Sequence, residues 1–237
     1  MGKKSSLISI VTTAYNEENI LEETILEWDS WLNQNKLNYE IIVYNDGSID
    51  NTLKILKKLN SSLKSFSYIN GSNNRGYGYG MKKAIEKASG DYIVTIDADN
   101  QYKIKNLKNF FFIFDSSLLC VTGHRERKKD SFLKVFADRV LKIIVKNLFK
   151  TKLKDTNCAL KMIHRDVIKK IKLESDDYSF PSELCLRIEN ENITIADVPI
   201  LHSFRKQGKS AISLFFTSYK FLKFLISLKI QFLKSNR

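Results

Sequence analysis

The chain has 237 residues, enough for one large domain or one domain with an appendage, and 43% of them are hydrophobic. This apolar share excludes an intrinsically disordered chain, and two prolines and nine glycines exclude collagen-like and proline-rich classes. The whole net charge of +13 lies in the second half, because residues 1–120 hold 14 Lys/Arg and 14 Asp/Glu whereas residues 121–237 hold 25 and 12.

The first half alternates short apolar segments with longer amphipathic ones. This alternation predicts βαβ units and a mostly parallel sheet with helices on both faces. The predicted strands are residues 8–13, 40–44, 66–69 and 92–96. The predicted helices are residues 17–32, residues 51–59 with Asp50 as the N-cap, and a segment that ends at 88–90. The apolar run at 7–11 is too short for the core of a signal peptide, so we expect a chain that is not secreted.

Polar segments follow all four predicted strands. They are residues 14–17, Asp46, residues 73–76 and residues 97–101. Each of them alone fits the ordinary polarity of loops. Because ligands of such sheets bind beyond the carboxyl ends of the strands, the four together predict one binding crevice.

The second half is less regular. Its predicted strands are residues 118–122, 159–163 and 193–198, and its predicted helices are residues 131–149 and 180–191. No repeat or clear linker interrupts the sequence. We therefore expect one domain over residues 1–210 and an amphipathic helical extension over residues 211–237.

Two acids, Asp97 and Asp99, end the fourth predicted strand. Residues i and i+2 of extended backbone share a face, so both carboxylates can point into one space. Carboxylate oxygens suit Mg²⁺ or Mn²⁺, which also bridge to phosphate oxygens, and Gln101 adds a neutral oxygen donor.

A basic segment at residues 123–130 leads into the predicted helix that begins at residue 131. The positive excess of this half predicts a polyanionic partner, which can be nucleic acid, an anionic membrane or a phosphorylated substrate. Arginine and lysine at helical spacing can bind a phosphate, although a solvated helix face is the simpler interpretation for Lys142 and Lys146. No sequence pattern of a nucleic-acid-binding module is present, so no nucleic acid is expected as a partner.

The three cysteines, Cys120, Cys158 and Cys185, lack the paired spacing of a zinc site or a disulfide framework. This favours a reducing, cytoplasmic location. Nothing in the sequence activates Cys158, which we interpret as a buried packing residue.

The segment at 212–234 is apolar but carries a polar stripe. A lysine at the centre of a membrane span costs about 2.5–3.5 kcal/mol, so the stripe favours a helix that lies in the membrane interface. Packing on its own domain or on a second subunit is the alternative. The stripe consists of Ser213, Thr217, Lys220, Lys223, Ser227, Gln231 and Lys234, opposite Phe215, Phe216, Phe221, Leu222, Leu225 and Phe232.

An ordered set of motifs carries a family resemblance. SIVTTAYNEE at 9–18, NDGSID at 45–50, NRG at 74–76 and DADNQ at 97–101 resemble the family 2 glycosyltransferases of the GT-A fold. GHR at 123–125, DTNCALK at 155–161 and RKQGKS at 205–210 are similar to motifs of the polyprenyl-phosphate (dolichol- or undecaprenyl-phosphate) sugar transferases. The resemblance implies an α/β, Rossmann-like GT-A domain.

The resemblance also implies a role for each matching residue. The nucleotide sugar would be bound by Ala14, Tyr15, Glu17, Asp46, Gly76, Asp97 and Ala98. Asp97, Asp99 and Gln101 would hold Mg²⁺ or Mn²⁺. The catalytic residues would be Asp99, Arg125 and Arg139, and Lys128 and Lys134 would join the two arginines in receiving the acceptor phosphate. Asp138 departs from the pattern, since a serine often lies there and an aspartate would repel a phosphate.

The function that the resemblance implies is inverting transfer of a sugar from a nucleotide diphosphate sugar to a polyprenyl phosphate, on the cytoplasmic face of an anionic membrane. The nearest alternative is transfer to a saccharide or another lipid hydroxyl in cell-envelope glycan synthesis, with Glu183 or Asp155 as the general base. A metal-dependent nucleotidyltransferase and a basic nucleic-acid-binding protein are remoter alternatives.

Overall fold

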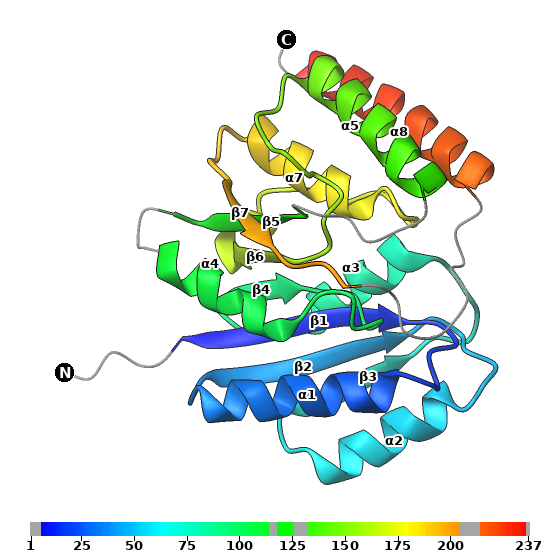
Figure 1. The fold of residues 1–237 in the computed structure, drawn as a ribbon, viewed down its shortest axis with the longest axis vertical. Helices are drawn as coiled ribbons and strands as arrows, with labels where there is room; N and C mark the ends of the chain where they lie inside the picture. The colour runs from blue at the N-terminus through cyan, green and yellow to red at the C-terminus, as the bar shows by residue number, and fades with distance from the viewer. Residues whose placement is uncertain (1–5, 114–117, 126–131, 204–213, 236–237) are drawn as a thin grey trace.

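Seven strands form one mixed sheet at the centre of the molecule, in the order β3-β2-β1-β4-β6-β5-β7 (Figure 1). The computed structural model describes residues 6–113, 118–125, 132–203 and 214–235. All strand pairs are parallel except those of β6, which runs antiparallel to β4 and β5. This confirms the predicted α/β class. The strands are β1 (Leu7–Ala14), β2 (Asn38–Asn45), β3 (Phe66–Asn70), β4 (Tyr92–Thr95), β5 (Cys120–Arg125), β6 (Lys161–His164) and β7 (Ala196–Ile200).

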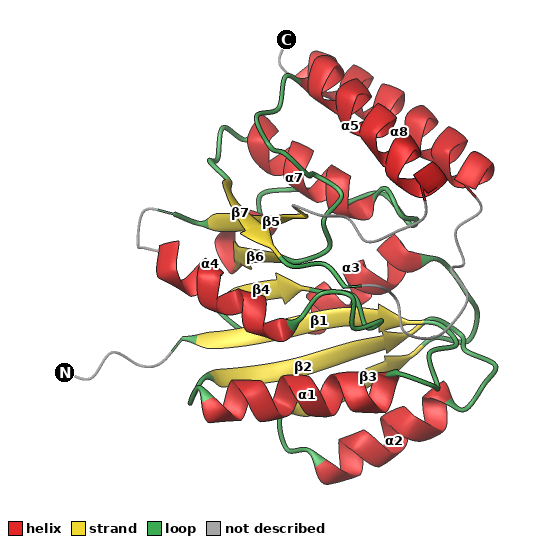
Figure 2. Ribbon diagram, viewed as in Figure 1, coloured by secondary structure: helices red, strands yellow, loops and turns green. Residues whose placement is uncertain are grey.

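Helices cover both faces of the sheet (Figure 2). The first helix begins at Leu21 and not at Glu17, because the Glu17 carbonyl accepts the N–H groups of Ile20 and Leu21 in a turn. The sequence pattern does not predict the helical segment 104–113. The helices are α1 (Leu21–Gln34), α2 (Thr52–Ser62), α3 (Tyr77–Lys87), the 3₁₀ turn η1 (Ile104–Asn106), α4 (Leu107–Ile113), α5 (Phe132–Phe149), α6 (Arg165–Ile168), α7 (Phe180–Asn190) and α8 (Leu214–Ser235).

The central strands are apolar on both faces because each face packs into its own hydrophobic core. On β1, Ile10 packs into the core that contains Trp28 of α1, whereas its neighbour Val11 packs into the core that contains Met81 of α3. All four side chains are fully buried. Burial on both faces explains why the sequences of these strands are continuously apolar and do not alternate between apolar and polar residues.

The C-terminal helix α8 lies beside α5 at the edge of the molecule (Figure 1). Its residues Phe221, Leu225 and Leu228 are buried in a small core with Val145 of α5 and Leu186 of α7. The structure therefore has the arrangement in which this helix packs on its own domain. No helix within the described ranges is long and apolar enough to cross a membrane.

We predict that Leu225→Ala lowers the free energy of unfolding by about 2–5 kcal/mol, since Leu225 is fully buried between α8 and its neighbours. Leu233→Ala on the same helix is the matched control, because Leu233 is 58% exposed and its truncation should cost under about 0.5 kcal/mol. Urea unfolding measures both values. Equal losses would contradict the packing of α8 on the domain.

Candidate functional site

The loops that follow β1 and β2 are joined by hydrogen bonds. The N–H of Asn16 donates to Ser48 Oγ and the N–H of Glu17 donates to Thr52 Oγ1, both at 3.0 Å. The N–H of Ile49 donates back to Asn16 Oδ1 at 2.9 Å. Asn16 has a left-handed backbone with φ of 54°, which turns the chain at this point. The first two predicted polar segments therefore lie against each other.

Asp46 joins the third polar segment to this pair. Its Oδ1 accepts the N–H of Arg75 and its Oδ2 accepts the N–H of Gly76, both at 2.8 Å. The side chain is buried, so Asp46 orders the loop before α3, and its contact with the nucleotide sugar stays a prediction. Gly76 has φ of +106°, and a Cβ there would lie 2.3 Å from the carbonyl oxygen of Asp176, so this position requires glycine.

The predicted nucleotide-binding residues of the first loop differ in exposure. Ala14 is buried at the end of β1, whereas the adjacent Tyr15 is 38% exposed. Glu17 is half-buried beside the same turn. An exposed aromatic ring next to ordered backbone can stack on a planar ligand.

The acidic pair Asp97 and Asp99 lies in a turn. The strand β4 ends at Thr95, so the two carboxylates do not share the face of an extended strand as the sequence analysis expected. Asp99 Oδ1 accepts the N–H of Gln101 at 3.0 Å, and Gln101 Nε2 donates to the carbonyl of Ser203 at 3.1 Å. These bonds hold the acidic turn against the chain that follows β7.

The donor set of this turn fits a metal that a substrate helps to coordinate. Within the described residues, no group of three or more His, Cys, Asp and Glu side chains could hold a metal ion alone. Mg²⁺ is commonly bound by one or two carboxylates together with waters and substrate phosphates. Asp97 and Asp99 supply that number of carboxylates; both residues are half-buried, whereas Ala98 between them is buried.

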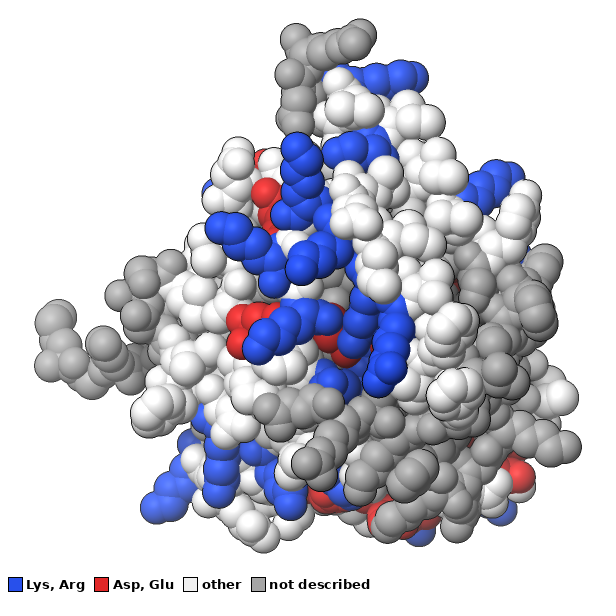
Figure 3. All heavy atoms as spheres, turned by 45° about the horizontal axis from the view of Figure 1, so that its top comes forward, with Lys and Arg blue, Asp and Glu red and all other residues white. Residues whose placement is uncertain are grey.

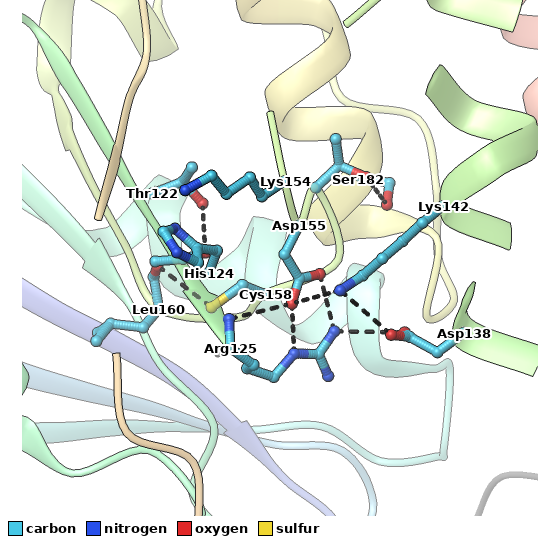
Figure 4. Close-up of polar contacts among 12 residues, drawn as sticks. Thr122, His124, Arg125, Asp138, Lys142, Lys154, Asp155, Cys158, Leu160 and Ser182 are labelled. Carbon is cyan, nitrogen blue, oxygen red and sulfur yellow. Dashed lines mark hydrogen bonds and ion pairs between the residues drawn. The ribbon is translucent and has the colours of Figure 1, made fainter. Parts of the chain in front are cut away.

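A second cluster lies at the end of β5 (Figure 4). The Arg125 guanidinium donates to both carboxylate oxygens of Asp155, with Nε at 2.5 Å and Nη2 at 2.8 Å. Asp138 of α5 lies 3.4 Å from Arg125 Nη2, and Lys142 Nζ lies 3.4 Å from both Asp138 and Asp155. Two cations thus balance two anions. Lys142 belongs to this cluster and not to a purely solvated face, and Asp138 has cationic neighbours that offset its repulsion of an anion.

Both carboxylates considered as general bases have other partners. Burial alone would raise the pKa of Asp155, but Arg125 and Lys142 hold that pKa well below its ordinary range. Glu183 is fully buried and accepts the N–H groups of Glu174 and Ser175, each at 2.8 Å, and Arg187 Nε at 2.7 Å. Neither carboxylate is arranged to remove a proton from a substrate hydroxyl.

The remaining predicted acceptor residues are only partly described. Arg139 is exposed on α5. Lys134 is placed as part of the backbone of the same helix, and Lys128 lies outside the described residues. The structure thus brings Arg125 and the helix of Arg139 together, and the contacts of the lysines stay a prediction.

Lys161 has a structural role that its sequence context does not predict. This lysine is 2% exposed, and its Nζ donates to Thr122 Oγ1 and to the carbonyls of Thr156 and Cys158. It therefore binds the loop that carries Asp155 to the strand β5. The position of a lysine within an otherwise apolar predicted strand is the one sequence feature that indicates this role.

Cys158 is fully buried, and burial raises its pKa to about 12, which confirms that it is a packing residue.

Comparison with known proteins gives relatives among lipid-phosphate sugar transferases. The chain is 26% identical to the dolichyl-phosphate beta-glucosyltransferase of Dictyostelium discoideum, over 95% of this chain and 75% of that protein. It is 24% identical to the undecaprenyl-phosphate 4-deoxy-4-formamido-L-arabinose transferase of Pseudomonas fluorescens, over 87% of this chain but 60% of that protein. The chain thus spans between three fifths and three quarters of these relatives.

The fold matches solved structures. The crystal structure of glucosyl-3-phosphoglycerate synthase from Mycobacterium tuberculosis with Mn²⁺ and UDP-glucose superposes with a TM-score of 0.70 at 17% identity, over 94% of this chain and 78% of that one. This similarity confirms the expected GT-A architecture. The model of glycosyl transferase family 2 matches residues 9–172, which is more than half of the chain. On this match and this fold, the chain belongs to glycosyl transferase family 2.

Proposed function

We propose that the protein is an inverting glycosyltransferase that moves a sugar from a nucleotide diphosphate sugar to a polyprenyl phosphate. The observation that carries the proposal is an acidic turn after β4 together with a cluster at the end of β5 in which Arg125 and Lys142 are paired with carboxylates. Relatives of the chain are named as polyprenyl-phosphate sugar transferases. Acids suit a metal-bound donor, and cations suit an anionic acceptor.

The donor would lie against the loops that Asp46 joins. The exposed ring of Tyr15, with Ala14 and Glu17, would line the nucleotide pocket, and Asp46 and Gly76 would border it. Asp97, Ala98 and Asp99, with Gln101, would hold the diphosphate and Mg²⁺ or Mn²⁺. When bound, the metal supplies positive charge that offsets the charge developing on the leaving diphosphate.

The acceptor phosphate would be received by Arg125 and Arg139, with Lys128 and Lys134. A phosphate oxygen is already anionic at neutral pH, so it needs positioning more than a general base. This agrees with the occupied oxygens of Asp155. Asp138, at 3.4 Å from Arg125, is held less closely than Asp155 and is the partner that a phosphate would displace.

One observation favours a second candidate, transfer to a saccharide or another lipid hydroxyl. The chain is 33% identical to the poly-beta-1,6-N-acetyl-D-glucosamine synthase of Staphylococcus aureus, over 53% of this chain and 30% of that protein. A hydroxyl acceptor needs a general base. Because Asp155 and Glu183 are both engaged, the phosphate acceptor is the better-supported candidate.

The two candidates are separated by the product of the reaction. The full chain is incubated with Mn²⁺ and radiolabelled UDP- and GDP-sugars, with either a polyprenyl phosphate or an oligosaccharide as acceptor. We expect label in the lipid phosphate and release of a nucleoside diphosphate. Label only in the oligosaccharide would establish the second candidate, and release of pyrophosphate would indicate a nucleotidyltransferase.

We predict that Asp99→Asn abolishes the Mn²⁺-dependent rise in melting temperature that nucleotide sugars produce. A ligand that binds only the folded state stabilises that state, and the variant would lose a carboxylate that binds the metal. Asp91→Asn is the matched control, since Asp91 lies at the opposite end of β4 and accepts the N–H of Leu7. Thermal shift with and without Mn²⁺ measures the effect. A full shift in Asp99→Asn would contradict the metal assignment.

The face formed by α5 and α8 is proposed to lie on an anionic membrane, on its cytoplasmic side. This face combines large exposed apolar side chains with lysines such as Lys220 and Lys223, a combination typical of helices at a membrane interface. Figure 3 brings this end of the molecule forward and shows Lys and Arg side chains gathered beside uncharged ones. The exposed apolar residues are Phe132, Phe136, Val140 and Ile143 on α5, and Tyr219, Ile226, Ile230 and Leu233 on α8.

We predict that the double variant Phe132→Ser and Phe136→Ser binds vesicles containing anionic phospholipid at least several-fold more weakly than the unmodified chain, because it removes exposed aromatic area from the α5 face. Phe112→Ser is the control: Phe112 is 91% exposed but belongs to α4. Vesicle sedimentation measures binding. Equal effects of the two changes would contradict this orientation.

A further inference from the structure

Tyr77 connects the start of α3 to the acidic turn. Its hydroxyl donates a hydrogen bond to Asp97 Oδ1 at 2.8 Å. A phenol hydroxyl is the donor and a carboxylate only accepts, so the direction of this bond is fixed. A phenylalanine would fill the same space without this bond.

The Tyr77 ring is fixed by two other rings. Tyr178 stacks on it with centroids 5.6 Å apart and an interplanar angle of 19°. Phe180, the first residue of α7, meets it edge-on at 6.2 Å and 70°. Such offset and edge-on pairs are favourable and directional, so they restrict the rotation of the ring and aim its hydroxyl at Asp97.

The segment that supplies Tyr178 is itself held to α3. The carbonyl of Asp176 accepts the N–H groups of Gly78 and Tyr79, and a Cβ on Gly78 would lie 2.4 Å from the carbonyl oxygen of Ser175. Glu183 binds the other end of this segment through the N–H groups of Glu174 and Ser175. The backbone segment that carries Tyr178 is therefore fixed against α3, and this places the Tyr77 hydroxyl beside Asp97.

We infer that Tyr77 is a positioning residue of the donor site, which orients the Asp97 carboxylate for the metal-bound diphosphate. The inference rests on the proposed function. A hydrogen bond to one oxygen restricts the rotation of a carboxylate, and partners of this kind strengthen metal binding by about 10- to 100-fold. None of the motifs on which the family resemblance rests includes Tyr77.

The test compares Mn²⁺ binding by calorimetry in the unmodified full chain and in Tyr77→Phe, with and without UDP. We expect Tyr77→Phe to weaken Mn²⁺ binding about tenfold and to leave UDP binding without metal unchanged. Tyr68→Phe is the matched control, because it removes a hydroxyl from a half-buried tyrosine of β3. Equal Mn²⁺ affinity in Tyr77→Phe and the unmodified chain would overturn the inference.

The unmodified chain separates this inference from the proposed function. If it binds no Mn²⁺ with any nucleoside diphosphate, the proposed function fails. If it binds Mn²⁺ and Tyr77→Phe binds equally, only the role of Tyr77 fails. Where circular dichroism shows that Tyr77→Phe does not fold, Tyr178→Leu replaces it, since this change removes the ring stacked on Tyr77 and keeps the hydroxyl. Unchanged Mn²⁺ affinity in Tyr178→Leu then overturns the inference.

Discussion

The arrangement of the site depends on one buried carboxylate, that of Asp46. The backbone N–H of Asp46 donates to the carbonyl of Ala14, the last residue of β1. The Asp46 side chain accepts two consecutive N–H groups, those of Arg75 and Gly76. One residue thus joins the loops after β1, β2 and β3. A buried carboxylate without such donors would carry a large desolvation cost, so the loops and the acid stabilise each other. The start of α3, and with it Tyr77, takes its place from this contact.

Charge is organised differently on the two sides of the sheet edge. Around β4 the acids are braced by neutral donors, the Tyr77 hydroxyl and the Gln101 N–H. Around β5 the acids are paired with cations, most closely Asp155 with Arg125. An anion that enters the second side must therefore compete with a carboxylate for Arg125. The proposed function assigns the metal-bound donor to the first side and the anionic acceptor to the second.

Much of the fold follows from local sequence, because short apolar runs such as 41–44 alternate with amphipathic segments at the spacing of βαβ units. What was missed depends on contacts between distant segments. The end of β4 at Thr95 and the segment 104–113 were not predicted, since a short apolar run does not distinguish a strand from a buried helix. The partners of Asp46 and Glu183 are backbone N–H groups, which no residue pattern reveals. The sequence favours lipid for the apolar face of α8 and leaves packing on the domain as the alternative, because nothing local identifies Val145 as its neighbour.

The proposed function requires the turn after β4 to hold a divalent cation against a nucleoside diphosphate. The most direct measurement is anomalous diffraction at the manganese absorption edge from crystals of the full chain soaked with Mn²⁺ and UDP. The account predicts one strong peak within about 2.0–2.3 Å of a carboxylate oxygen of Asp97 or Asp99 and of a diphosphate oxygen. Density for UDP with the manganese peak elsewhere, or with both carboxylates facing away from the diphosphate, would contradict it.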